Sequence, residues 1–103
     1  MQITQETFFD LAQGNPGALK ILMMLWHEKE ATVYIRELVR LNIKGWKIWV
    51  AYKDLYQFDI TKTFEENTEL QMEEFKRKLL DGTLLEELKQ TQDWKYYESK
   101  GAV

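Results

Sequence analysis

The stretch that decides the fold is "GNPGAL", residues 14–19, which lies between two apolar runs. Gly14 can adopt the positive φ that ends a helix, and Asn15 is a preferred N-cap residue. Pro16 suits the first position of a helix, where its missing N–H is not needed. The stretch therefore predicts a joint, at which one helix ends at Gly14 and a second runs from Pro16 to about Lys29.

The alternative interpretation of "GNPG" is a phosphate-binding loop. Such loops need several glycines in a fixed register after a strand, followed by a lysine or a helix N-terminus. No strand pattern precedes Gly14, and Lys20 lies one turn too deep in the next helix to match. We therefore expect the helix joint.

Helical spacing of apolar residues continues on both sides of the joint. Thr4 is placed to cap the first helix, and a third helix is expected over residues 32–41. The second helix is apolar on nearly all faces, which is typical of a central, buried helix. In residues 46–55, "WKIWVAYKDL", the aromatic and β-branched content favours a strand over 46–52, whereas the apolar spacing is helical. We expect a helix there and keep the strand as the alternative.

The acidic C-terminal third also has a helical pattern. Asp59 is expected to cap a short turn of helix, and Asn67 or Thr68 to begin a longer helix. Gly82 is expected to end that helix.

A last helix is expected from Thr83, its cap, to residue 94, with Glu86 in the capping-box position. Residues 95–103 are expected to fray. The whole pattern predicts an all-α fold, a compact single domain of five or six helices over residues 1–94.

Composition supports a globular protein and limits its setting. The chain has 103 residues, of which 45% are hydrophobic and 30% charged, and it has no cysteine. The N-terminal residues do not resemble a signal peptide, and the longest apolar run, residues 21–26, is too short to span a membrane. We expect a soluble, cytoplasmic protein.

The residue inventory argues against an enzyme. His27 is the only histidine and Ser99 the only serine, so neither a catalytic triad nor a histidine metal site is expected. Adjacent glutamates at 65–66, 73–74 and 86–87 point away from each other on a helix, unlike a pair of carboxylates that face each other across a cleft. We expect no catalytic residue, no metal and no cofactor.

A basic stretch over residues 36–53 is the first candidate surface, with five basic residues and one acidic residue, Glu37. Its cations recur every fourth residue up to position 44, which predicts one helix face, and a tryptophan beside a glycine is expected to be exposed. Such a surface suits an acidic protein patch or phosphates and stacked bases. It is also what a solvated helix face paired with nearby glutamates looks like. If the protein acts by binding, we expect the contact to centre on Arg36, Arg40, Lys44, Trp46 and Lys47.

A second candidate is the acidic face formed by Glu66, Glu69 and Glu73. It could act as a phosphate mimic toward a nucleic-acid channel. Three basic residues follow it directly, however, and the net charge of −3 is small for a mimic. A solvated face explains these glutamates equally well.

Two strings resemble a family of small phage- and prophage-encoded proteins. The family has a Gly-Asn-Pro-Gly-Ala turn and a later Gly-x-Lys-Ile-Trp-x-x-Tyr-Lys-Asp stretch, which together match the central half of this chain. Trp46 stands where a small residue is expected. The matching residues are Gly14, Asn15, Pro16, Gly17 and Ala18, and then Gly45, Lys47, Ile48, Trp49, Tyr52, Lys53 and Asp54.

The chain also resembles, in size and lack of cysteine, a group of anti-CRISPR proteins that act on type II CRISPR nucleases. The resemblance implies a non-catalytic inhibitor whose partner is that nuclease or its guide complex. A phage virion-assembly or DNA-packaging accessory protein is the alternative, and a direct nucleic-acid binder is a third reading that depends on the basic stretch alone.

Overall fold

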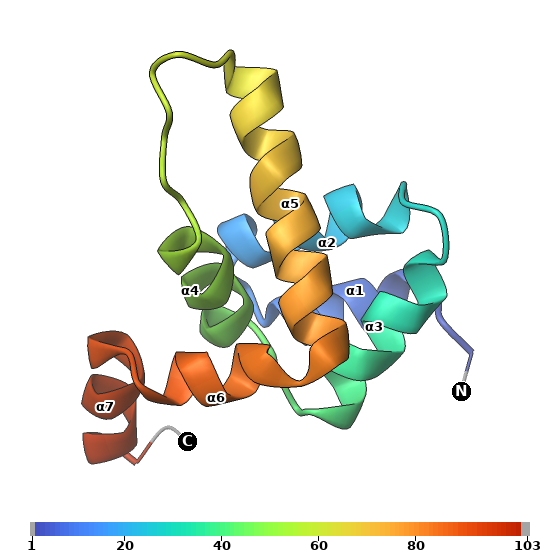
Figure 1. Ribbon diagram of the computed structural model, residues 1–103. Coiled ribbons are helices and arrows are strands. Elements are labelled where there is room, and N and C mark those ends of the chain that lie inside the picture. The colour runs from blue at the N-terminus through green and yellow to red at the C-terminus, as the bar shows by residue number, and fades with distance from the viewer. Residues whose placement is uncertain (1, 102–103) are drawn as a thin grey trace.

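The computed structural model describes residues 2–101, and within them the chain is all helical (Figure 1). The all-α prediction is confirmed, and the segment 46–52 is helical rather than a strand. The number of helices is seven in the described residues, where five or six were expected. They are α1 (Gln5–Ala12), α2 (Pro16–Trp26), α3 (Ala31–Arg40), α4 (Trp46–Asp54), α5 (Phe64–Asp81), α6 (Thr83–Lys89) and α7 (Gln92–Ser99).

The joint at "GNPGAL" forms as predicted. Gln13 and Gly14 have φ values of 48° and 76°, which end α1 and reverse the chain. Asn15 then caps α2, since its Oδ1 accepts a hydrogen bond from the N–H of Ala18 at 3.0 Å. Pro16 is the first residue of α2.

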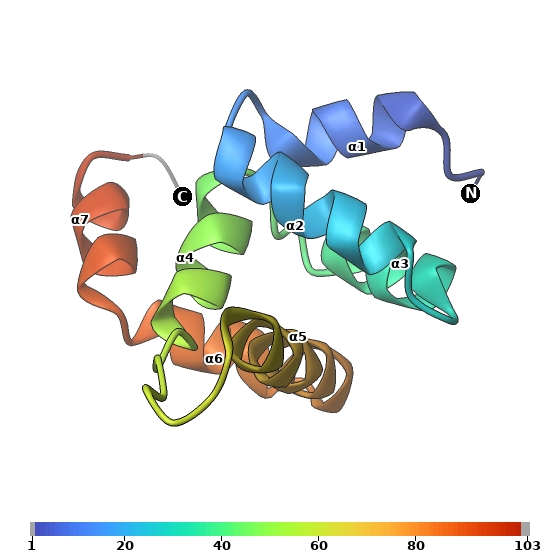
Figure 2. The ribbon, with the colours of Figure 1, turned by 90° about the horizontal axis from the view of Figure 1, so that it is seen from above.

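The core lies between α2 and α5, with α3 and α4 joining the two sides (Figure 2). Helix α2 packs against α1, α3 and α4, whereas α5 packs against α3, α4 and α6. The apolar side chains that point inward are almost completely buried, so burial of this face stabilises the fold. The largest are Phe75, Leu11, Ile21, Leu22, Leu25, Ile35, Leu38, Ile43, Ile48, Leu79 and Leu88.

Helix α2 differs from the prediction in length and in burial. It ends at Trp26 rather than near Lys29, and the chain turns before Glu30, whose φ of 64° precedes α3. The helix is not buried on most faces, because Met23 and Trp26 are exposed. Its apolar content therefore exceeds what the core of this chain uses.

The start of α5 also differs. Residues 55–63 form a loop, so Asp59 caps no helical turn, and α5 begins at Phe64 rather than at Asn67 or Thr68. A capping box explains the earlier start: Thr63 Oγ1 accepts from the N–H of Glu66 at 3.1 Å, and Glu66 accepts from the N–H of Thr63 at 3.2 Å.

The C-terminal helices need three further corrections. Thr83 is the first residue of α6 and not its cap, and Glu86 forms no capping box there. The predicted last helix is interrupted before Thr91, whose Oγ1 accepts from the N–H of Trp94 at 3.1 Å and caps α7. The boundary expected after residue 94 falls inside α7, so residues 95–99 are helical; residues 102–103 lie outside the described part.

Candidate functional site

The two strings quoted from the sequence pack against each other in the structure. Gly17, in the first turn of α2, lies under the indole of Trp49 on α4. A Cβ at Gly17 would lie 2.6 Å from Trp49 Cε3, which is closer than side chains tolerate. Gly45, at the start of α4, donates its N–H to the carbonyl of Leu11 in α1. The helix joint and the aromatic helix are thus one interlocked unit.

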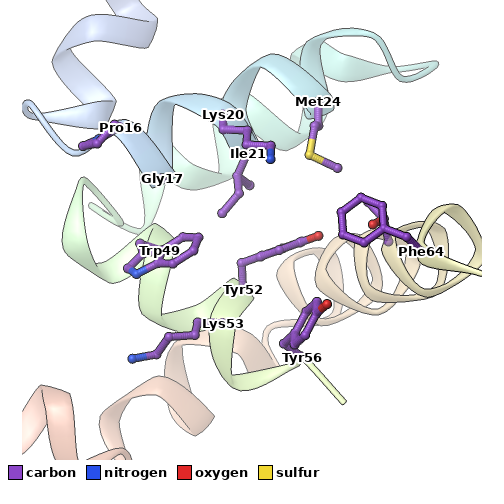
Figure 3. A pocket seen from close by; sticks show the side chains of 11 residues that line it. Pro16, Gly17, Lys20, Ile21, Met24, Trp49, Tyr52, Lys53, Tyr56 and Phe64 are labelled. Atoms are coloured by element: carbon purple, nitrogen blue, oxygen red, sulfur yellow. The ribbon is translucent and has the colours of Figure 1, made fainter. Parts of the chain in front are cut away.

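An open groove of about 600 Å³ lies beside this unit, between α2, α4 and the first turns of α5 (Figure 3). Pro16, Gly17, Lys20, Ile21 and Met24 come from α2, and Phe64 and Thr68 from α5. The residues that line it from α4 and its C-terminal end are Trp49, Tyr52, Lys53 and Tyr56.

Three of the exposed lining residues are aromatic. Trp49, Tyr56 and Phe64 are 37%, 44% and 60% exposed. Tyr52 extends from α4 toward Phe64 across the groove (Figure 3). Burial, and then the neighbouring Tyr56, raise the pKa of Tyr52 above its ordinary value, which further favours the protonated hydroxyl. The groove therefore offers apolar surface with a phenolic hydrogen-bond donor.

The charge in the groove is of one sign. Lys20 and Lys53 line it, and no carboxylate is among its lining residues within the described chain. Lys53 reaches Asp93 at 3.5 Å, but both side chains are about half exposed, and such a pair contributes little to stability. The groove is accordingly a basic, aromatic surface.

The predicted cations of the basic stretch do not form a single helix face. Arg36 and Arg40 are exposed on α3, and Arg40 is bound to Glu37 through two hydrogen bonds of 3.0 and 2.8 Å. The hydrogen bond from Arg40 lowers the pKa of Glu37. Lys44 lies in the loop after α3, because the helix ends at Arg40. Helix α3 contributes no residue to the groove.

Trp46 is not the freely exposed aromatic that the sequence suggested. Its ring stacks on Tyr97 with centroids 4.3 Å apart and lies 5.9 Å from the ring of Trp94. Lys47 places its Nζ 5.0 Å from the centre of the Trp94 ring, and burial lowers the pKa of Lys47. These contacts join α4 to α7, so Trp46 and Lys47 belong to a packed interface.

Two glutamates of the predicted acidic face make contacts that stabilise the fold. Glu66 is part of the capping box, and Glu73 accepts a hydrogen bond from Lys76 at 2.6 Å. Lys76 is buried and also binds Glu28, 3.1 Å away in the turn before α3. Burial lowers the pKa of Lys76, but its hydrogen bonds to Glu73 and Glu28 outweigh this and raise it. Of the three predicted glutamates, Glu69 is exposed and makes no ion pair within the described chain.

No described group of three histidines or acidic residues could hold a metal ion. His27 is exposed at the C-terminal end of α2. Within residues 2–101, no helix has both the length and the apolar character needed to cross a membrane.

Sequence reasoning missed the groove. Helix α2 carries apolar residues on all sides, and the core uses only one of its faces. Surplus apolar residues on a surface helix indicate an interaction site, but the exposed Met23 and Trp26 are not among the residues that line the groove. The partner surface could not be located in advance, because Trp49, Tyr56 and Phe64 come from segments whose contact with α2 depends on tertiary packing.

Comparison with known proteins finds no match: no family model fits this chain, and no curated protein or solved structure is significantly similar.

Proposed function

We propose that this protein is a non-catalytic inhibitor that acts by binding another protein, and that the groove between α2, α4 and α5 is its binding surface. The observation that carries the binding proposal is the set of exposed aromatic side chains, Trp49, Tyr56 and Phe64, around one open groove. Tryptophan and tyrosine are enriched among the residues that dominate binding energy at interfaces.

The chemistry of the groove favours an acidic segment with apolar side chains. Its size, about 600 Å³, suits a few bulky side chains. Lys20 and Lys53 are placed to attract carboxylates that flank those side chains. An amphipathic helix that inserts its apolar face into such a groove is a common mode of peptide recognition.

The resemblance to anti-CRISPR proteins supplies the proposed target. We assign the inhibitor to phage or prophage and its target to the type II CRISPR nuclease or its guide complex, in the host cytoplasm. This assignment depends on the resemblance, whereas the location of the binding surface depends on the groove.

The test is an interference assay with two matched variants. Cells that carry an active type II CRISPR system would express the wild-type chain, Phe64→Ala or Phe9→Ala, and receive a targeted plasmid. The two phenylalanines are 60% and 61% exposed, but only Phe64 lines the groove. We expect the wild type and Phe9→Ala to block interference, and Phe64→Ala to lose the block.

A binding measurement with the purified nuclease complex tests the proposed target and the proposed binding surface independently. We expect Phe64→Ala to weaken binding about tenfold or more, with Phe9→Ala near wild type. Undiminished interference with well-expressed wild type would refute the proposed target. Inhibition that both variants retain would refute the groove as the surface. Contacts to phosphates weaken steeply as the salt concentration rises. If the affinity falls in that manner, a nucleic-acid target would be favoured.

A further inference from the structure

Lys20 is a cation of the groove that has no counter-charge. It is exposed on α2 and takes part in none of the ion pairs among residues 2–101. Lys53, the other lysine of the lining, already lies 3.5 Å from Asp93. An ammonium group beside apolar surface attracts an anion more strongly than one in bulk water, because its surroundings are less polar. The groove therefore has a place for one negative charge next to Lys20.

The hydroxyl of Tyr52 is a hydrogen-bond donor that faces the same space. Burial, and then Tyr56, account for its raised pKa, and no hydrogen bond within the described chain contributes. The ring packs edge-on against the buried Phe75 with centroids 6.1 Å apart, so the core fixes its direction. Tyr52 extends into the groove from α4, and Lys20 extends into it from α2 (Figure 3). Two helices thus present one donor and one cation to a common ligand.

Apolar side chains line the groove around these two polar groups. Ile21 and Met24 come from α2, and Phe64, which is 60% exposed, comes from α5. A ligand that reaches both Lys20 and Tyr52 must therefore carry an apolar part beside its charged group. An acidic residue that follows or precedes a large apolar residue in a protein segment has this chemistry.

The lining favours a carboxylate over a phosphate group. No arginine lines the groove within the described chain. A phosphate carries up to two negative charges and three acceptor oxygens, and arginine is over-represented where proteins recognise it. One lysine and one hydroxyl match the single charge and the two oxygens of a carboxylate.

We propose that Lys20 and Tyr52 bind the side-chain carboxylate of an acidic residue in the partner segment that enters the groove. The ammonium of Lys20 pairs with the carboxylate, and the hydroxyl of Tyr52 donates to one of its oxygens. A neighbouring apolar side chain of the segment packs against Met24 and Phe64. The inference rests on the proposed function, which places the partner segment in the groove, and it makes Tyr52 a residue that selects acidic over neutral segments.

The test compares two small probes, 3-phenylpropanoate and 3-phenylpropanamide, which share the ring and chain and differ in the charge of the end group. Each is titrated into the isotope-labelled full chain and followed by NMR. We expect saturable shifts of the signals of Lys20, Tyr52 and Phe64. The acid should bind about fivefold more tightly than the amide, because its hydrogen bond and ion pair are charge-assisted.

Two variants remove the proposed contacts singly. Tyr52→Phe keeps the ring against Phe75 and removes the hydroxyl, and Lys20→Gln removes the charge. Each should weaken binding of the acid about threefold and bring the affinities for the two probes closer together. The matched controls are Tyr34→Phe, at a half-buried ring, and Lys29→Gln, at an exposed lysine; both lie outside the groove and should keep the wild-type preference.

Three results would overturn the proposal: equal binding of the two probes, no saturable response to the acid, or a preference for the acid that is unchanged in either Tyr52→Phe or Lys20→Gln. The nuclease takes no part in this titration, so the two proposals fail separately. Undiminished interference would leave the preference for the acid in place. Equal binding of the two probes would leave the groove as a docking surface that does not select carboxylates.

Discussion

The two halves of α5 differ in how completely their side chains are used. In the C-terminal half, Phe75 and Leu79 are fully buried, and Lys76 bridges two glutamates. In the N-terminal half, Phe64 and Leu70 are exposed, and Gln71, at the boundary, is buried without a partner. The C-terminal half stabilises the fold. The other half keeps apolar surface in excess of what the fold uses, which is where we place partner binding.

Two phenylalanines of α5 provide the strongest test of this contrast. Phe75→Ala should lower the free energy of unfolding by about 3–5 kcal/mol, because it leaves a cavity in the core. Phe64→Ala, 60% exposed, should change it by less than about 0.5 kcal/mol. Urea denaturation measures both values. Similar costs for the two substitutions would remove the distinction between a structural and a functional half.

A substitution at Trp46 tests whether the packing of α7 against α4 stabilises the fold. Trp46→Ala removes the stacking partner of Tyr97 and should destabilise the chain by about 2 kcal/mol, since the indole is only partly buried. Amide hydrogen exchange should increase mainly in residues 92–99. If stability and exchange stay unchanged while partner binding falls, Trp46 acts in binding, as the sequence first suggested.

A substitution at Gly17 tests how closely α2 packs against Trp49 beside the groove. Gly17→Ala should cost about 1 kcal/mol, because overpacking against Trp49 outweighs the better helix propensity of alanine. In a Trp49→Ala background the same change should become stabilising, by about 0.5–1 kcal/mol. A double-mutant cycle measured by thermal denaturation gives the coupling. Equal effects in both backgrounds would mean that Gly17 and Trp49 do not constrain each other.

The smallest expected effect concerns the loop formed by residues 55–63. Hydrogen bonds from Thr61, through its hydroxyl and its N–H, and then from Lys62, lower the pKa of Asp59 to about 2. A lowered pKa means that the ionised form stabilises the folded loop. That contribution is complete above about pH 4 and is lost as the pH falls toward about 2.

NMR signals of residues 57–62 should therefore report loosening of the loop over this pH range. Asp59→Asn removes the titrating group and should flatten the profile. A profile that is the same in the variant would assign the transition to other carboxylates.

Local sequence determined the helical fold to a large extent. The joint at residues 14–16 follows from the conformational preferences of Gly14, Asn15 and Pro16, which act within a few residues. Apolar spacing correctly placed α4 as a helix although its residue types favour strands. The error at the start of α5 arose where Thr63, Asn67 and Thr68 offered competing caps, whereas the cap at Thr91 was missed within a stretch expected to be one helix. Local preference alone does not rank such caps.

Tertiary structure alone decided what the exposed residues do. The cations at 36, 40 and 44 have the spacing of one helix face, but α3 ends at Arg40, so Lys44 lies in the following loop. Trp46 and Trp49 are three residues apart and chemically identical. The first packs against α7, whereas the second covers Gly17 and faces the groove. Helix propensity and periodicity are properties of neighbours along the chain, whereas burial of a particular face depends on segments distant in sequence. The sequence therefore specifies the helices, and only their packing shows which apolar and polar groups are left for a partner.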